Sequence, residues 1–218
     1  MPKRRFALPL IVIAIAAGIF FLAELATLYY YLCGTCGQAS LPYSSVRTIA
    51  GLNSEFGEPF GVAVKDGEIY VSDGQTGKIW RIAVNSPPAE FAAGLETPSA
   101  IAFGKNGDLI VADSGSHTIK RVYKNGTIAI VAGIDGQLGD VDGDALSARF
   151  NAPVGVAVRH DGSIIVADTY NDKIKLISNG VVTTLAGSTR GFADGSGPNA
   201  KFDTPCSVAA WQDGRTVV

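Results

Sequence analysis

The chain has 218 residues, of which 47% are apolar and 17% charged, with 26 glycines and a formal net charge of −2. High glycine content with few charged residues suits short strands joined by tight turns better than a helical bundle. Lys3, Arg4 and Arg5 all precede a long apolar run, so the rest of the chain is more acidic than the net charge suggests. This balance argues against a nucleic-acid partner, which would require a basic face.

The N-terminal segment has the pattern of a membrane signal-anchor. Residues 6–32 form an apolar run in which Glu24 is the only charged residue. A helix over this run would be about 40 Å long, enough to cross a hydrocarbon core of about 30 Å. The basic residues favour a cytoplasmic tail at 1–5, which sends the C-terminal bulk to the periplasm or the cell exterior. A signal peptide cleaved before Ser40 is the alternative, but its apolar region would normally be shorter.

Residues 33–45 are expected to form a linker that contains the motif Cys33-Gly-Thr-Cys36. In an oxidising compartment Cys33 and Cys36 could form a small disulfide or bond to another chain. A thioredoxin-like redox pair is the alternative, but no βαβ pattern surrounds the motif. We therefore expect a structural or incidental role for these two cysteines.

Residues 46–218 contain an internal repeat. Each unit has an apolar run that begins near a proline, an Asp-Gly or Asn-Gly turn, a second apolar run that ends in aspartate, and a third run around an isoleucine. The units begin at Pro59, Pro98, Pro153 and Pro205, and the first three carry Asp73, Asp113 and Asp168. The glycine pairs supply the positive φ that two-residue hairpin turns require. A fourth strand is expected at residues 90–93, 127–132 and 181–186, which makes each unit the four-stranded blade of a propeller.

The pattern Pro-x-Gly-Val-Ala-Val, Asp-Gly, Ile-x-Val-Ala-Asp and Ile-Lys resembles the NHL-repeat family. Two longer linkers, at 132–150 and 186–202, also match one another. The resemblance implies an all-β fold, an NHL-type β-propeller, with about three and a half blades of a usual six within 46–218. We expect residues 62–186 to form three adjacent four-stranded blades in an open, incomplete arc, and residues 46–50 to form an orphan strand.

Several carboxylates need to be weighed as candidate sites. Asp73, Asp113 and Asp168 could form a ring, but because they recur in every unit we favour a structural role as acceptors of backbone N–H groups in the next loop. Asp140, Asp142 and Asp144 alternate as in a calcium loop, yet they lack the glycine and glutamate positions of an EF-hand. The pair Asp142-Gly143 has a twin at Asp194-Gly195, which indicates a repeated turn.

Glu58, directly before Pro59, resembles the glutamate that opens the gluconolactonase family, whose calcium sits in the propeller channel. Under that resemblance Glu58 would be a metal ligand, whereas its simpler interpretation is a solvated loop charge. His117 and His160 are the only histidines, too few for the three-histidine zinc site of the peptide-amidating lyases. No nucleophile motif is present. Cys206 takes a blade position and is expected to stay reduced.

These observations favour a non-catalytic protein without a cofactor. It would be a membrane-tethered extracytoplasmic platform whose propeller loops bind a protein or a glycan. The alternative is a calcium-dependent, gluconolactonase-like hydrolase.

Overall fold

The computed structural model describes residues 48–51, 55–211 and 215–218, nearly all within one compact unit, Ile49–Val218. The expected tail, membrane helix and linker at 1–45, with Cys33 and Cys36, lie outside the described residues. Within the described ranges, no helix combines the length and the apolar character needed to cross a bilayer. The helical elements there are two single 3-10 turns, η2 (Thr169–Asn171) and η3 (Gly197–Asn199).

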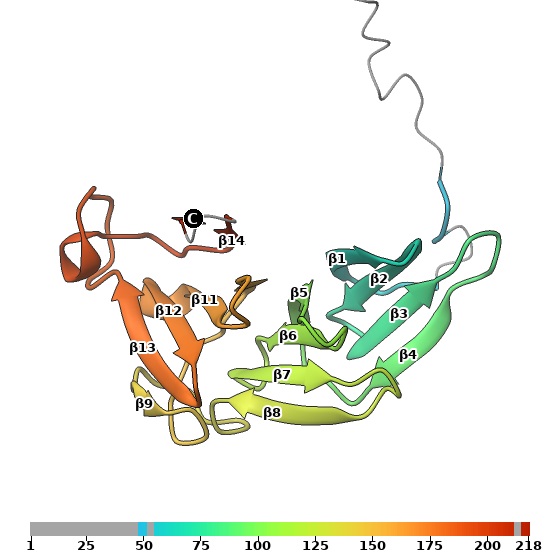
Figure 1. The fold of residues 1–218 in the computed structure, drawn as a ribbon, viewed down its shortest axis with the longest axis horizontal. Coiled ribbons are helices and arrows are strands. Elements are labelled where there is room, and N and C mark those ends of the chain that lie inside the picture. Colours follow the sequence, from blue (N-terminus) through green and yellow to red (C-terminus); the bar gives the residue numbers. More distant parts are fainter. Residues whose placement is uncertain (1–47, 52–54, 212–214) are drawn as a thin grey trace, which may run out of the picture. The chain divides into compact units, whose positions relative to one another are not determined.

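Antiparallel sheets follow one another along the chain, each with its strands in sequence order apart from β9 (Figure 1). The first blade contains β1 (Pro59–Lys65), β2 (Glu68–Asp73), β3 (Lys78–Ile82) and β4 (Ala89–Ala93). The second contains β5 (Pro98–Phe103), β6 (Leu109–Asp113), β7 (Thr118–Val122) and β8 (Ile128–Ala132). The third contains β10 (Gly155–Val158), β11 (Ile164–Asp168), β12 (Lys173–Ser178), β13 (Val181–Ala186) and β9 (Gly143–Asp144). Two short strands, β14 (Ala209–Ala210) and β15 (Thr216–Val217), begin a fourth unit.

The expected all-β propeller architecture is confirmed, with three corrections. The third blade has a fifth strand, because β9 pairs with the outer edge of β13. Residues 48–50, the described part of the expected orphan strand, form no strand. Among the described residues, two-residue hairpin turns occur only at Asp66-Gly67 and Asn179-Gly180, where both residues have positive φ. In the hairpins that contain Asn106-Gly107, Asn125-Gly126 and Asp161-Gly162, five residues join the paired strand ends, and of each pair only the glycine has positive φ.

The blades pack through their first strands, since β1 contacts β5, β5 contacts β10, and β10 contacts β14. This close approach explains the glycine of the repeat. A Cβ at Gly61 would lie 2.5 Å from the Ser99 carbonyl oxygen, and one at Gly155 would lie 2.9 Å from that of Cys206. Real Cβ atoms do not come so near, so only glycine allows neighbouring first strands to meet here.

Hydrophobic cores fill the gaps between the blades, and a further core that includes Ile165, Ile174 and Val208 lies between the third blade and the fourth unit. We call the space between the first and second blades the first gap, and that between the second and third blades the second gap. The first gap contains Tyr70, Ile79, Ile101, Leu109 and Val111 among its buried side chains. The second contains Ile110, Ile119, Phe150, Ile164 and Val166. Each strand thus sends alternate side chains into opposite gaps, as the period of two requires.

Candidate functional site

The two ends of each blade differ in chemistry. The end at which the second strand finishes carries the repeat aspartate, and we call it the aspartate end. The opposite end carries the hairpin between the first and second strands, and we call it the hairpin end.

At the aspartate end, Asp73, Asp113 and Asp168 are all fully buried. Asp73 accepts the backbone N–H groups of Gly57 and Glu58, each at 2.9 Å. Asp113 accepts those of Glu96 at 3.0 Å and Thr97 at 2.9 Å, and Asp168 accepts that of Asn151 at 2.8 Å. All five of these donors lie in the segment that precedes the first strand of the same blade. A backbone donor in the following loop, where we expected the donors, is found for Asp73, which accepts the Thr76 N–H at 3.3 Å. Each aspartate therefore closes its own blade by tying the end of the second strand to the start of the first.

The seventh residue after each aspartate supplies a side-chain donor. It is Trp80 in the first blade, whose indole N–H donates to Asp73 at 3.2 Å. In the second and third blades it is a lysine, Lys120 at 2.7 Å from Asp113 and Lys175 at 3.3 Å from Asp168. Either side chain satisfies the buried carboxylate, but only lysine also neutralises its charge.

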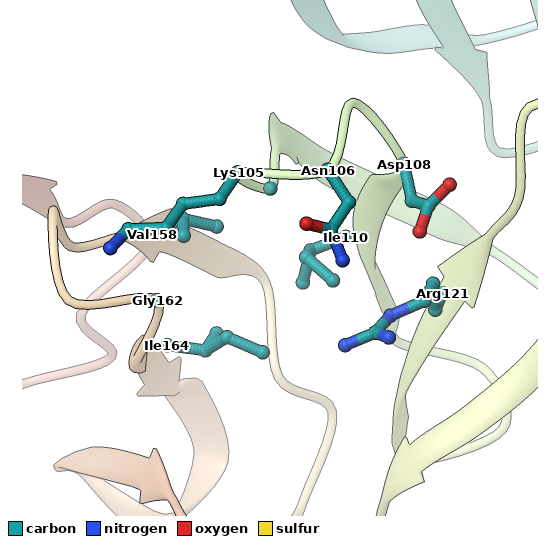
Figure 2. A pocket seen from close by; sticks show the side chains of 9 residues that line it. Lys105, Asn106, Asp108, Ile110, Arg121, Val158, Gly162 and Ile164 are labelled. Carbon is teal, nitrogen blue, oxygen red and sulfur yellow. The ribbon is translucent and has the colours of Figure 1, made fainter.

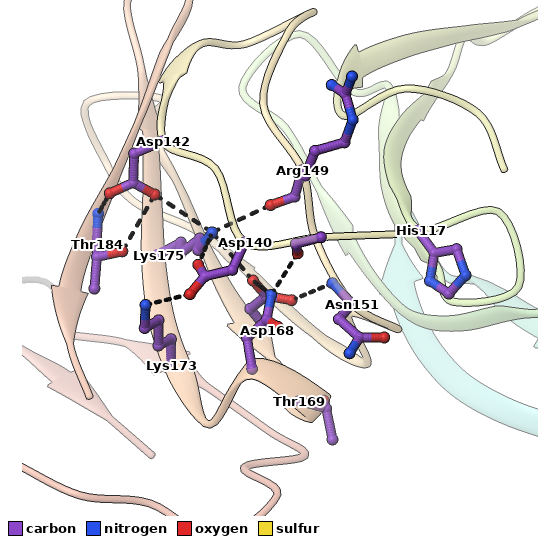
Figure 3. Close-up of polar contacts among 12 residues, drawn as sticks. His117, Asp140, Asp142, Arg149, Asn151, Asp168, Thr169, Lys173, Lys175 and Thr184 are labelled. Carbon is purple, nitrogen blue, oxygen red and sulfur yellow. Dashed lines mark hydrogen bonds and ion pairs between the residues drawn. The ribbon is translucent and has the colours of Figure 1, made fainter. Parts of the chain in front are cut away.

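Lys175 is the centre of the largest ionic cluster in the described part of the chain (Figure 3). It is fully buried, and its Nζ atom lies 2.9 Å from Asp140 Oδ1 and 3.3 Å from Asp142 Oδ1. It also donates to the Arg149 carbonyl oxygen at 3.2 Å and lies over the Phe150 ring.

The alternating aspartates of the expected calcium-like loop belong to this lysine cluster and to local turns. Asp140 also pairs with Lys173, and Asp142 accepts the Thr184 N–H at 2.7 Å. Asp144 instead accepts the N–H of Leu146 at 3.1 Å in a local turn. Within the described ranges, no group of three or more His, Cys, Asp and Glu side chains is placed to hold a metal ion.

The cluster shifts the pKa values of its members in opposite directions. Burial raises the pKa of Asp168 to about 6, against the lowering effects of Lys175, Asn151 and Asn171. Burial also acts on Asp140, but the ammonium groups of Lys173 and Lys175 outweigh it and lower the pKa of that carboxyl. The pKa of Lys175 is raised, because the carboxylates of Asp168, Asp140 and Asp142 outweigh the effect of burial. Asp168 is thus the member closest to changing its charge near neutral pH.

The same end of the blades carries a second repeated device that joins neighbours. His117 and Asp172 are equivalent loop residues, both with positive φ. His117 Nδ1 accepts the Ala152 N–H at 3.0 Å, and Asp172 Oδ1 accepts the Thr204 N–H at 2.8 Å. Each acceptor belongs to one blade and each donor to the start of the next. The sequence considered alone did not predict this role for His117, although its fixed position four residues after the repeat aspartate was a usable signal.

The remaining sequence-predicted residues are spread out. Glu58 is exposed at the start of β1, and within the described ranges its side chain makes no hydrogen bond or ion pair. Its backbone N–H donates a hydrogen bond to the Asp73 carboxylate, and its carbonyl oxygen accepts the Gly74 N–H at 2.9 Å. Cys206 is an exposed free thiol. His160 is exposed at the hairpin end, where it borders a shallow depression with Trp211.

A pocket of about 190 Å³ opens at the hairpin end of the second gap (Figure 2). Its walls are Ile110, Val158 and Ile164, and its polar groups are Lys105, Asn106, Asp108 and Arg121. Arg121 pairs with Ile110 across β6 and β7, so both side chains point into this gap. Figure 2 shows the Arg121 guanidinium and the Asn106 amide directed into the same space. Neither side chain makes a hydrogen bond or ion pair with the described residues. We call this site the hairpin pocket.

Comparison with known proteins places these features in a family context. A model of the teneurin NHL domain matches residues 84–178. The chain is 35% identical to mouse (Mus musculus) NHL-repeat-containing protein 4 over 95 residues, which are 43% of this chain and 68% of that protein. It is 31% identical to cattle (Bos taurus) NHL repeat-containing protein 2 over 138 residues, 56% of this chain but only 19% of that longer protein.

Solved structures show the same fold. One is an auxiliary nutrient binding protein from Bacteroides thetaiotaomicron, which superimposes with a TM-score of 0.61 at 23% identity. The superposition covers 70% of this chain and 43% of that one. Likeness at this level of identity shows the propeller architecture alone.

Proposed function

This chain belongs to the NHL-repeat family, and we propose that it is a non-catalytic, membrane-tethered platform that binds a protein or glycan partner outside the cytoplasm. The observation that carries the proposal is the contrast between the two ends of the blades. At the aspartate end, the buried carboxylates and lysines are engaged with one another. At the hairpin end, Arg121 and Asn106 border a pocket and have no partner among the described residues.

The arrangement suits binding because a rigid scaffold presents loops at modest entropic cost. The hydrogen bonds of His117 and Asp172 join neighbouring blades at the aspartate end, which helps to fix the spacing of the hairpins at the opposite end. Residues 6–32 would provide the tether, with the basic residues before them holding the N-terminus in the cytoplasm.

A direct test is to screen the purified full chain, in detergent, against a glycan array and a library of displayed random peptides. We expect reproducible binding to members of one library. We also expect substitutions at the hairpin end to weaken that binding more than substitutions of exposed residues elsewhere. The absence of binding to both libraries would contradict the proposal.

The second candidate is a calcium-dependent, lactonase-like hydrolase, and the observation that favours it is Glu58. Glu58 is exposed next to the aspartate end of β1, and its carboxylate forms no hydrogen bond or ion pair with the described residues. For the binding platform, calcium should change neither the melting temperature nor any lactonase activity. A bound calcium would stabilise the fold by about 2.7 kcal/mol at a hundredfold excess over its dissociation constant. A shift of that size, lost in Glu58→Ala, would favour the hydrolase.

A further inference from the structure

Three aromatic side chains of the first gap have aliphatic counterparts in the second, and two of these counterparts, Ile110 and Val158, line the hairpin pocket. In the first gap Tyr70 packs edge-on against Phe91 and Phe103, with ring centroids 5.0 and 5.1 Å apart. Strand registers make Ile110, Val131 and Val158 the equivalents of these three residues. The aliphatic side chains are smaller, so the space that the rings fill in one gap is a pocket in the next.

An arginine at the same position behaves differently in the two gaps. Arg81 pairs with Tyr70 across the strands and lies 3.9 Å from the Glu68 carboxylate. Its equivalent, Arg121, pairs with Ile110, and no ion pair forms with Asp108, the counterpart of Glu68. In the third blade the position is Leu176, paired with Ile165. The fold therefore accepts leucine here, and packing alone does not require the charge of Arg121.

The pocket has an excess of positive charge. Arg121 and Lys105 carry two cationic groups, against the single carboxylate of Asp108. Arg121 is only partly exposed and stands beside Ile110 and Ile164. A partly desolvated guanidinium that has no counter-ion among the described residues is well prepared to bind a carboxylate, which it can hold through two parallel hydrogen bonds. The Asn106 amide supplies a further donor on the same side.

Size and wall chemistry narrow the class of ligand. At about 190 Å³ the pocket is smaller than the ~300–1,000 Å³ of sites that enclose a whole small molecule. It suits one side chain projecting from a larger partner. Its walls are the aliphatic groups of Ile110, Val158 and Ile164, which can also cover the methylene groups of that side chain.

We propose that the hairpin pocket binds an Asp or Glu side chain of a peptide segment in a partner protein, with Arg121 as the ion-pairing group. This inference rests on the proposed binding function and names the chemistry of the partner. Recognition of acidic motifs by arginine is a recurrent mode of peptide binding.

The experiment selects displayed random peptides against the full chain of 218 residues and measures Kd for the best binders. We expect binders to share an acidic residue, and Glu→Gln or Asp→Asn in the peptide to weaken binding. Arg121→Leu introduces the residue that the fold already holds at Leu176, and it should weaken binding by about tenfold to a hundredfold. Arg81→Leu is the matched control, because it removes the equivalent arginine from a filled gap, and it should leave Kd unchanged.

A second variant tests the pocket without removing the charge. Val158→Phe places in the second gap the residue found at Phe103 in the first, and it should fill the pocket and weaken the same peptides. Circular dichroism melting of each variant would separate loss of binding from loss of fold. Peptide binding that is unaffected by Arg121→Leu overturns this inference but leaves the binding platform intact. Binding of a glycan without binding of any peptide would also overturn this inference and leave the binding platform intact. Failure of both libraries would overturn the binding platform as well.

Discussion

Each of the three buried repeat aspartates accepts hydrogen bonds from the backbone, whether or not it also has a lysine partner. Asp73 shows this in its simplest form, since it has no lysine partner and is held by Gly57, Glu58, Thr76 and Trp80. Burial alone would raise the pKa of Asp73, but those hydrogen bonds outweigh it and hold the pKa well below its usual range. Trp80 can therefore replace lysine, because hydrogen bonds are enough to stabilise the ionised form.

Asp168 should titrate at a much higher pH than its neighbour Asp140. Burial raises the pKa of Asp168 to about 6, whereas Lys173 and Lys175 lower that of Asp140. Carboxyl carbon NMR of the folded protein should show an inflection near pH 6 for Asp168 and one below the ordinary aspartate range for Asp140. An Asp168 inflection below about pH 4 would show that Lys175 outweighs burial.

These shifts have opposite consequences for stability. The folded pKa of Asp168 lies above its unfolded value, so its contribution to stability is complete below about pH 4 and decreases as the pH rises to about 6. The folded pKa of Asp140 lies below its unfolded value, so its contribution is present above about pH 4 and is lost as the pH falls. Because the two effects oppose one another, site-by-site titration is more informative than a melting curve.

At the scale of elements, the loop residue four positions after Asp113 and after Asp168 helps to join one blade to the next, because its side chain accepts a backbone N–H of the following unit. Asp172 has φ near 54° and accepts the Thr204 N–H at 2.8 Å. Aspartate and asparagine tolerate this conformation better than other residues with a side chain, and β-branched residues tolerate it worst.

Asp172→Asn should therefore be nearly neutral, while Asp172→Val should destabilise the protein by about 2–3 kcal/mol. The loss combines a hydrogen bond of about 1 kcal/mol with a backbone penalty of about 1–2 kcal/mol. Urea denaturation of the two variants, compared at equal pH, would measure the difference. Equal stability of Asn and Val variants would mean that this joint between blades contributes little.

Much of the fold could be predicted from the sequence because each strand is a short apolar run bounded by turn residues. The strands around Asp73, Asp113 and Asp168 and the fourth strands of each blade were anticipated in this way. The two-residue strand β9 was not predicted, because Gly143 and Asp144 carry no strand pattern in the sequence. They form a strand only because they pair with Val182 and Val181.

The candidate site was less predictable than the fold. The change from Tyr70 to Ile110 and from Phe103 to Val158 is visible when the repeats are aligned. The sequence does not show that these positions face one another across adjacent blades. Because they do, the smaller side chains of the second gap together leave the space of a pocket. Likewise, Lys175 belongs to an evident Ile-Lys motif, but its contacts with Asp140 and Asp142 depend on how a long linker folds back.

At the scale of the whole molecule, the proposed function requires the propeller to lie on the far side of a membrane from the N-terminus. The repeat units supply the binding surface, and residues 6–32 would supply the anchor. The basic residues Lys3, Arg4 and Arg5 lie immediately before this apolar run, which is the arrangement that keeps the leading end of an anchor in the cytoplasm.

A reporter enzyme that is active only after export should therefore be active when fused after Val218, and a reporter active only in the cytoplasm should be silent there. Replacing Lys3, Arg4 and Arg5 together with glutamate should reduce export, because the charge bias that sets orientation is removed. Membrane fractionation with N-terminal sequencing of the mature chain completes the experiment, since an anchored protein keeps residues 6–32. Activity of the cytoplasmic reporter would contradict the topology. A mature chain that begins near Ser40 would show that the apolar segment is a cleaved signal peptide, in which case the propeller reaches its partner without a tether.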